Sequence, residues 1–173
     1  AQGVALAATT VGLESTIVMP ENAPQAKVDA TRGYGAEVEL HGDDFNEAMA
    51  YAQAKAEEPG TLFVHAYDDP DIVAGQGTIG LEIHEQVPDV DTVIVPIGGG
   101  GLIGGISTAL KALDDSVRVI GVQADMASTV PESLDKGVPI DEDAPKTIAD
   151  GIATGSISEL TLGLIDEHVD RVV

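Results

Sequence analysis

The stretch DTVIVPIGGGGLIGG, residues 91–105, decides the fold. A short apolar, β-branched run leads directly into four glycines, and a segment with helical spacing follows them. Glycine is unfavourable inside helices and strands because it loses the most backbone freedom on folding. Four in a row therefore indicate that something approaches this backbone more closely than a Cβ atom would allow.

The same alternation of strand and helix patterns runs along the whole chain. We expect strands at 15–20, 36–40, 61–65, 91–96, 117–122 and 169–173. We expect helices at 44–58, with Asp43 or Asp44 as cap, and at 70–87, with Asp69 as cap and Pro70 at its first position. A third helix is expected at 101–113. The last should follow a capping box of Ser156 and Glu159 and end at about residue 168. Because several strands are continuous apolar runs, the pattern predicts an α/β fold with a mainly parallel sheet and flanking helices.

Composition narrows the class of protein. The 173 residues are 43% hydrophobic and include no cysteine, so disulfides and Cys-ligated metals are excluded. We find no signal peptide and no apolar run of membrane-spanning length, and we expect a cytoplasmic protein that does not bind membranes. Thirty acidic residues against eight basic ones give a net charge of -22, spread over the chain. This favours an acidic, salt-adapted surface and argues against nucleic-acid binding.

The glycines after the strand predict an anion site. In a parallel sheet, ligands bind where strands end and helices begin, and the first N–H groups of a helix favour negative charge. We expect the backbone of Gly98, Gly99, Gly100, Gly101 and Leu102 to hold a phosphate without help from Lys or Arg. A tight turn that packs against a neighbouring segment is the alternative.

Two phosphate ligands compete for this loop. Gly99, Gly101 and Gly104 satisfy the G-x-G-x-x-G pattern of dinucleotide sites, after a strand and before a helix. Such a site also needs an acid at the end of the next strand to hold the ribose. That strand ends at Gln123, and Asp125 comes two residues late. An NAD-binding module therefore remains an alternative.

Several segments together resemble one enzyme family. PIGGGGLIGGI resembles the phosphate loop of fold-type II pyridoxal-phosphate enzymes (tryptophan synthase β-like), and AQGVALAA, TIVMPENAPQAKVDATRGYGAEVELHG, FVHAYDDPDIVAGQGTIGLEI and TIADGIAT resemble segments of the threonine dehydratase (threonine ammonia-lyase) and serine racemase family. The resemblance implies that the cofactor is pyridoxal 5'-phosphate and that its phosphate sits on Gly98–Leu102. It also implies a lyase of isoleucine biosynthesis that converts threonine or serine to a 2-oxo acid and ammonia, with Gly151 on the substrate side.

The resemblance also implies which parts are missing. The family's Schiff-base lysine is expected upstream of Ala1, because none of Lys27, Lys55, Lys111, Lys136 and Lys146 matches its motif. Both ends look cut, and the 173 residues alone are expected to be inactive. Some members hold a divalent metal at positions that correspond to Gln123, Ala127 and Thr129. Because neutral side chains stand there, we predict no metal.

The resemblance predicts two lobes and an oligomer. Residues 1–33 are expected to be part of a small mobile lobe, and residues 34–173 most of the large cofactor-binding lobe. The expected partners are a small amino-acid substrate and further copies of the chain. A non-catalytic fragment that binds a phosphate ligand or a partner protein remains the second alternative.

Overall fold

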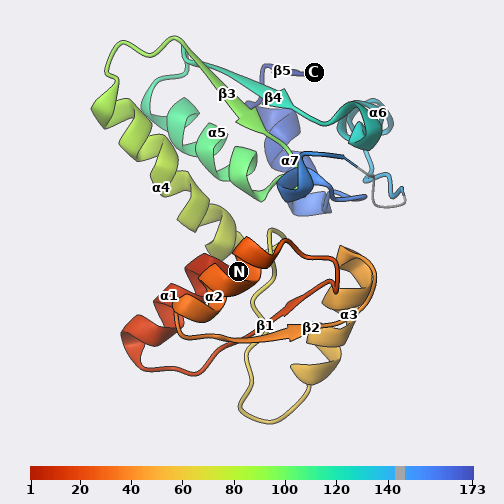
Figure 1. The fold of residues 1–173 in the computed structure, drawn as a ribbon. Helices are drawn as coiled ribbons and strands as arrows, with labels where there is room; N and C mark the ends of the chain where they lie inside the picture. Colours follow the sequence, from red (N-terminus) through yellow and green to blue (C-terminus); the bar gives the residue numbers. More distant parts are fainter. Residues whose placement is uncertain (143–146) are drawn as a thin grey trace. The chain divides into compact units, whose positions relative to one another are not determined.

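The chain folds into two compact units, Ala1–Val64 and His65–Val173 (Figure 1). The computed structural model describes residues 1–142 and 147–173, except for the side chain of Ala127. Lys146 therefore lies outside the described residues. None of the helices in the described ranges is long and apolar enough to cross a bilayer.

The first unit is a small βαβ arrangement. It contains α1 (Gln2–Val11), β1 (Thr16–Met19), α2 (Gln25–Gly33), β2 (Glu37–Leu40) and α3 (Phe45–Lys55). The two strands pair in parallel, with Thr16 opposite Glu37 and Met19 opposite Leu40. The Asp44 side chain accepts a hydrogen bond from the Glu47 N–H and caps α3, as one of the two predicted caps.

The division between the units differs from the predicted boundary after residue 33. Because β2 pairs with β1 and α3 packs on β1, residues 34–64 complete the sheet of the first unit. No local pattern of residues indicates this pairing, since a parallel pair joins segments that a helix separates along the chain.

The strand predicted at 61–65 is wrong. No strand is assigned there, and the side chains of Leu62 and Val64 are 84% and 39% exposed. An apolar run forms a strand only beside another strand that pairs with it, and the described residues offer none here.

The second unit carries a three-stranded parallel sheet in the order β3-β4-β5. Along the chain it contains α4 (Pro70–Gln86), β3 (Thr92–Pro96), α5 (Gly101–Leu113), β4 (Arg118–Val122), η1 (Asp125–Ala127), α6 (Val130–Lys136), η2 (Asp150–Ile152), α7 (Glu159–His168) and β5 (Arg171–Val172). Asp69 accepts hydrogen bonds from the N–H groups of Asp71 and Ile72, so the predicted start of α4 is confirmed. The predicted α/β class with parallel strands is confirmed as well.

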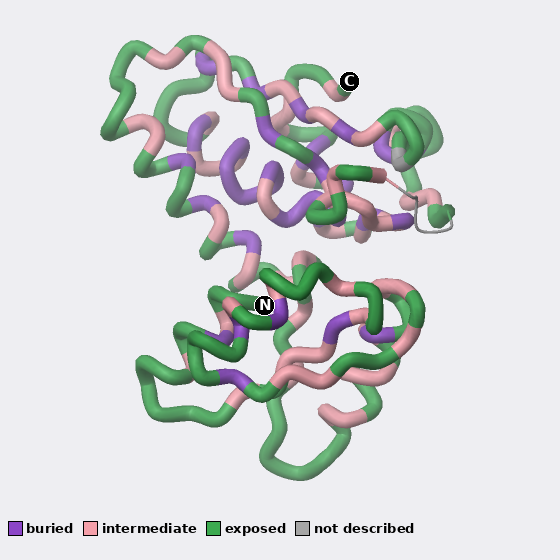
Figure 2. Tube along the Cα trace, in the orientation of Figure 1, coloured by how far each residue is buried: buried purple, intermediate pink, exposed green. Residues whose placement is uncertain are grey.

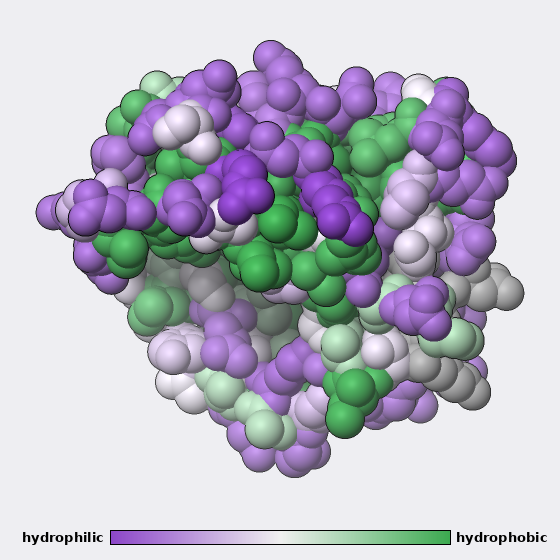
Figure 3. All heavy atoms as spheres, turned by 90° about the horizontal axis from the view of Figure 1, so that it is seen from above, coloured by the Kyte–Doolittle hydropathy of each residue, from purple (hydrophilic) through white to green (hydrophobic). Residues whose placement is uncertain are grey.

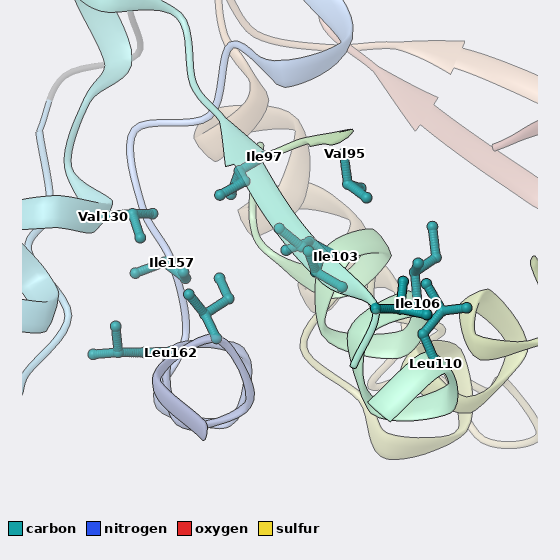
Figure 4. Close-up of a cluster of buried hydrophobic side chains, with 11 residues drawn as sticks. Val95, Ile97, Ile103, Ile106, Leu110, Val130, Ile157 and Leu162 are labelled. Carbon is teal, nitrogen blue, oxygen red and sulfur yellow. The ribbon is translucent and has the colours of Figure 1, made fainter. Parts of the chain in front are cut away.

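The core of the second unit lies between α5 and one face of this sheet. Most of α5 is buried (Figure 2), and its Ile103, Ile106 and Leu110 belong to one buried cluster that also contains the sheet residue Val95 and Leu162 of α7 (Figure 4). The opposite face of the sheet keeps Ile94 66% exposed and Val173 50% exposed. In Figure 3, apolar side chains gather in the middle of the face viewed from above.

Candidate functional site

The loop Gly98–Gly100 joins the end of β3 to the start of α5 and is fixed at both ends. Ile97, just before it, donates its N–H to the Val122 carbonyl at 2.8 Å. The side chains of Ile97, before the loop, and Ile103, after it, are fully buried and belong to the core (Figure 4). Gly100 has a φ of 88°, a left-handed conformation that side-chain-bearing residues rarely adopt, and it is the N-cap of α5.

The N-terminus of α5 presents backbone donors that find no partner in the described part of the chain. The N–H groups of Gly98–Ile103 donate no hydrogen bond there, and the first bond is from Gly104 to the Gly100 carbonyl at 2.9 Å. Gly99, Gly100 and Gly101 are nevertheless buried. Buried backbone donors are almost always paired, and the helix dipole adds partial positive charge here. The loop is therefore suited to hold an anion.

Protein atoms approach each of the four glycines closely. An added Cβ would lie 3.2 Å from the Ile152 Cα at Gly98, 2.3 Å from the Tyr67 ring at Gly99, 2.8 Å from the Thr161 Cβ at Gly100 and 2.9 Å from the Tyr67 Cβ at Gly101. The predicted close approach is thus confirmed. In the structure, however, the approaching groups belong to the protein, so tight packing accounts for the glycines as well, and the unpaired N–H groups carry the anion interpretation.

Thr161 ties the start of α7 to the glycine loop. Its Oγ1 donates a hydrogen bond to the Gly99 carbonyl at 2.8 Å, and the residue is fully buried. The same threonine forms a capping box with Ser158, whose Oγ accepts the Thr161 N–H at 3.2 Å. The predicted capping box of Ser156 and Glu159 is wrong, because α7 begins at Glu159 and the helix is capped by Ser158.

The segment that contains Ile152 and Thr154 also contacts the loop. Ile152 and Thr154 reach Gly98, and the Thr154 Oγ1 is buried without a hydrogen-bond partner in the described chain. Gly151, the predicted substrate-side residue, is exposed, and an added Cβ there would meet nothing within 4 Å. The structure thus brings Thr154, rather than Gly151, into contact with the glycine loop.

Tyr67 is the residue of this site that the sequence analysis missed. Its N–H and that of Asp68 both donate to His65 Nδ1, at 3.2 and 2.8 Å, and the His65 and Tyr67 rings meet edge to face at 4.9 Å. Its hydroxyl lies 3.3 Å from the Ser156 Oγ. Two features of the sequence could have pointed to Tyr67: it lies just before the start of a predicted helix, and aromatic residues make up only 3% of the chain.

Comparison with known proteins now gives the family. A sequence profile described as "Pyridoxal-phosphate dependent enzyme" matches residues 1–173. The chain belongs to this family. It is 48% identical to the L-threonine ammonia-lyase of Thermotoga maritima over all 173 residues, which correspond to 43% of that protein. The chain spans about half the length of the curated relatives it matches.

Solved structures of a threonine deaminase and of a serine racemase share the fold. The processed form of threonine deaminase isoform 2 from Solanum lycopersicum matches with a TM-score of 0.90 and 39% identity, over 99% of this chain and 50% of that one. Maize serine racemase matches with a TM-score of 0.91 and 36% identity, over 100% of this chain and 52% of that one.

Three lysines of this pyridoxal-phosphate family member are engaged in ion pairs, namely Lys55, Lys111 and Lys136. Lys55 pairs with Glu39, and this hydrogen bond lowers the pKa of Glu39 and raises that of Lys55. Lys136 pairs with Glu132 at 2.5 Å. Lys111 pairs with Asp170 at 3.0 Å. It lies in the last turn of α5, ten residues after Gly101, so about 15 Å of helix separates the two residues.

At the position where we predict no metal, the Gln123 side chain accepts a backbone hydrogen bond. Gln123 Oε1 accepts the Val130 N–H at 3.0 Å, at the start of α6, and the side chains of Gln123 and Thr129 are buried. Among the described residues, no group of three or more His, Asp or Glu side chains could hold a metal ion. The absence of a metal stays a prediction.

Proposed function

We propose that this chain is the phosphate-binding part of a threonine/serine dehydratase, an ammonia-lyase that uses pyridoxal 5'-phosphate. The reaction would remove the β-hydroxyl and then the amino group of threonine or serine, and would give a 2-oxo acid and ammonia. The observation that most supports this proposal is the set of partly buried N–H groups at the start of α5 that have no partner in the described residues. The 48% sequence identity to an L-threonine ammonia-lyase supports a hydroxyl-bearing amino acid such as threonine or serine as the substrate.

The residues present fit the phosphate group of the cofactor. The N–H groups of Gly98, Gly99, Gly100, Gly101 and Leu102 lie at and just before the N-terminus of α5, and α5 has no acidic residue in its first turn that would repel an anion. The Thr154 hydroxyl, buried and without a partner in the described residues, could add a side-chain hydrogen bond on the Gly98 side.

The role of this chain is to bind and orient. When bound, pyridoxal phosphate stabilises the negative charge that develops on the substrate α-carbon. The glycine loop would hold the phosphate at a fixed point, because Ile97 and Ile103 anchor both of its ends and Thr161 anchors its middle. Gly151 would line the substrate side, where its lack of a side chain leaves room. The lysine that carries the cofactor would lie outside these 173 residues.

Further proposals concern the setting of the enzyme. The net charge of -22 supports a protein adapted to molar salt, where screening suppresses self-repulsion. We also propose a cytoplasmic homo-oligomer that serves isoleucine biosynthesis, on the basis of the family resemblance. The NAD alternative is disfavoured, because the family is defined by another cofactor and because the candidate ribose-binding acid, Asp125, lies in η1 beyond β4.

The test uses the full-length protein that contains these residues, at high salt. The cofactor-free enzyme is supplied with pyridoxal 5'-phosphate or with pyridoxal, and 2-oxo acid release from L-threonine and L-serine is measured. We expect release with the phosphorylated cofactor only. Borohydride reduction and peptide mapping should place the cofactor on a lysine outside residues 1–173.

The other outcomes would each count against part of this proposal or support one of the alternatives to it. Release that is equal with pyridoxal would refute the role of the glycine loop. Cofactor binding without 2-oxo acid from either amino acid would favour the non-catalytic alternative. Formation of D-serine instead of 2-oxo acid would favour a racemase, as the similarity to maize serine racemase allows.

A further inference from the structure

The ring of Tyr67 fills the side of the glycine loop on which side chains would otherwise lie. An added Cβ on Gly99 would fall 2.3 to 2.4 Å from three ring atoms, Cδ1, Cε1 and Cγ. An added Cβ on Gly101 would fall 2.9 Å from the Tyr67 Cβ and 3.1 Å from its backbone. Because the Tyr67 Cβ and backbone beside Gly101 cannot rotate away, a larger residue is excluded there. At Gly99 an added Cβ would force the ring out of its position.

Tyr67 is itself held by contacts that fix both its backbone and its ring. The His65 Nδ1 accepts the N–H groups of Tyr67 and Asp68, which shapes the turn before α4. The tyrosine hydroxyl lies within hydrogen-bond distance of the Ser156 Oγ, at 3.3 Å, in the segment that also brings Thr154 to Gly98. Tyr67 therefore connects the turn before α4, the glycine loop and the segment before α7.

We propose that Tyr67 is a positioning residue of the phosphate site. Its ring fixes the turn Gly99–Gly101 so that the backbone N–H groups of the loop stay unpaired and available to the ligand, and its hydroxyl holds the ring through Ser156. Gly99 and Gly101 are then glycines because of Tyr67, whereas the ligand needs only their N–H groups. This inference rests on the proposed cofactor site but concerns the residue that shapes it.

The first experiment asks whether the glycine and the ring compete for one space. In the full-length enzyme, Gly99→Ala, Tyr67→Ala and the double variant are compared for the dissociation constant of pyridoxal 5'-phosphate and for the unfolding midpoint. We expect Gly99→Ala to weaken cofactor binding by tenfold or more and to lower the midpoint, since a Cβ forced into a packed site costs about as much as a tenfold change in affinity. Tyr67→Ala alone should also weaken binding, because the turn loses the ring that fixes it. Since the added Cβ clashes only while the ring is present, Gly99→Ala should cost little more once Tyr67→Ala has been made.

The matched control is Gly75→Ala, on an open face of α4 where an added Cβ meets nothing within 4 Å. It should leave cofactor binding unchanged and should not lower the midpoint. If Gly99→Ala weakens cofactor binding by the same factor in the Tyr67→Ala background as in the wild type, the ligand itself needs the glycine and the proposal is overturned.

The second experiment tests the hydroxyl. Tyr67→Phe and Ser156→Ala each remove one partner of a single contact, so a double-mutant cycle should be non-additive. We expect each single variant to raise the cofactor dissociation constant about two- to fivefold, the range of one neutral hydrogen bond, and the double variant to do no more than either one. Additive effects would show that the two hydroxyls act separately and would overturn this part.

Failure of the proposed function remains distinguishable from failure of this inference. An enzyme that binds no pyridoxal phosphate refutes the function, yet the unfolding midpoints of the Gly99→Ala series still report whether Tyr67 and Gly99 compete for space. Normal cofactor binding by the wild-type enzyme together with additive effects of Gly99→Ala and Tyr67→Ala refutes only the role of Tyr67.

Discussion

Gly105→Ala should destabilise the second unit, against the general preference of helices for alanine. In the structure, a Cβ at Gly105 would lie 2.3 Å from the Val73 carbonyl oxygen and 2.6 Å from the Gly77 nitrogen, both backbone atoms of α4. The shorter contact is about 1 Å less than the 3.4 Å at which ordinary van der Waals contact begins. Because no side chain can rotate away, α4 and α5 would have to separate.

Two opposing terms set the magnitude. Alanine is favoured over glycine in a helix by about 1 kcal/mol. Overpacking a close contact costs about 1–3 kcal/mol, and a backbone-to-backbone clash belongs at the upper end. We therefore expect a net loss of about 2 kcal/mol for Gly105→Ala. Gly77→Ala, whose nearest atom is 3.2 Å away, should be close to neutral, and Gly75→Ala should stabilise by up to about 1 kcal/mol.

Urea unfolding of the full-length protein at constant salt, followed by circular dichroism, measures this series. The decisive quantity is the order of the three variants, because their helix-propensity gain is the same and only the space differs. Gly105→Ala as stable as the wild type would refute the close packing of α4 against α5 and, with it, the assignment of these glycines to helix contact.

Three further predictions concern single hydrogen-bonding groups. Ser158→Ala should lower the free energy of unfolding by about 1 kcal/mol in urea titrations, because it removes the cap of α7. The hydrogen bond from the Val119 N–H, at 2.7 Å, lowers the pKa of Asp170, so this stabilisation is present above the unfolded-state pKa and is lost as the pH falls through the folded-state value. Asp170→Asn should therefore be less stable than wild type by about 1 kcal/mol at neutral pH, a value kept small by partial exposure, with the difference vanishing in acid-range unfolding curves. Thr154→Val should leave the cofactor-free protein as stable as wild type or slightly more stable, but should raise the pyridoxal-phosphate dissociation constant about fivefold in equilibrium dialysis, whereas Thr154→Ser should not.

The parts of the fold that the sequence predicted correctly are those with short-range causes. Asp44 and Asp69 cap helices by bonding to N–H groups two or three residues away, and Pro70 fits the first turn because its missing N–H needs no partner there. Gly98–Gly101 combine a strand end and a helix start within one loop. Such signals are complete within a few residues, so no knowledge of the tertiary structure is needed.

The failures have long-range causes. Residues 61–65 carry the composition of a strand, but a strand also needs a neighbour that pairs with it. The choice between Ser156 and Ser158 as the cap of α7 depends on where the helix starts, and Thr161 sets that point through its bond to the Gly99 carbonyl. Tyr67 contacts the glycine loop only because α4 packs against α5.

The same close packing would preorganise the proposed anion site. Helix α5 is held by backbone contact with α4 at Gly105, by the α7 residue Leu164 at Gly104 and by the core side chains of Ile103 and Ile106. Its first N–H groups therefore stand at fixed positions before any ligand arrives. A donor set that needs no reorganisation stabilises a bound anion at little entropic cost. The glycines within α5 give up helix propensity of about 1 kcal/mol each, and in return they bring its neighbours close enough to hold the N-terminus in place.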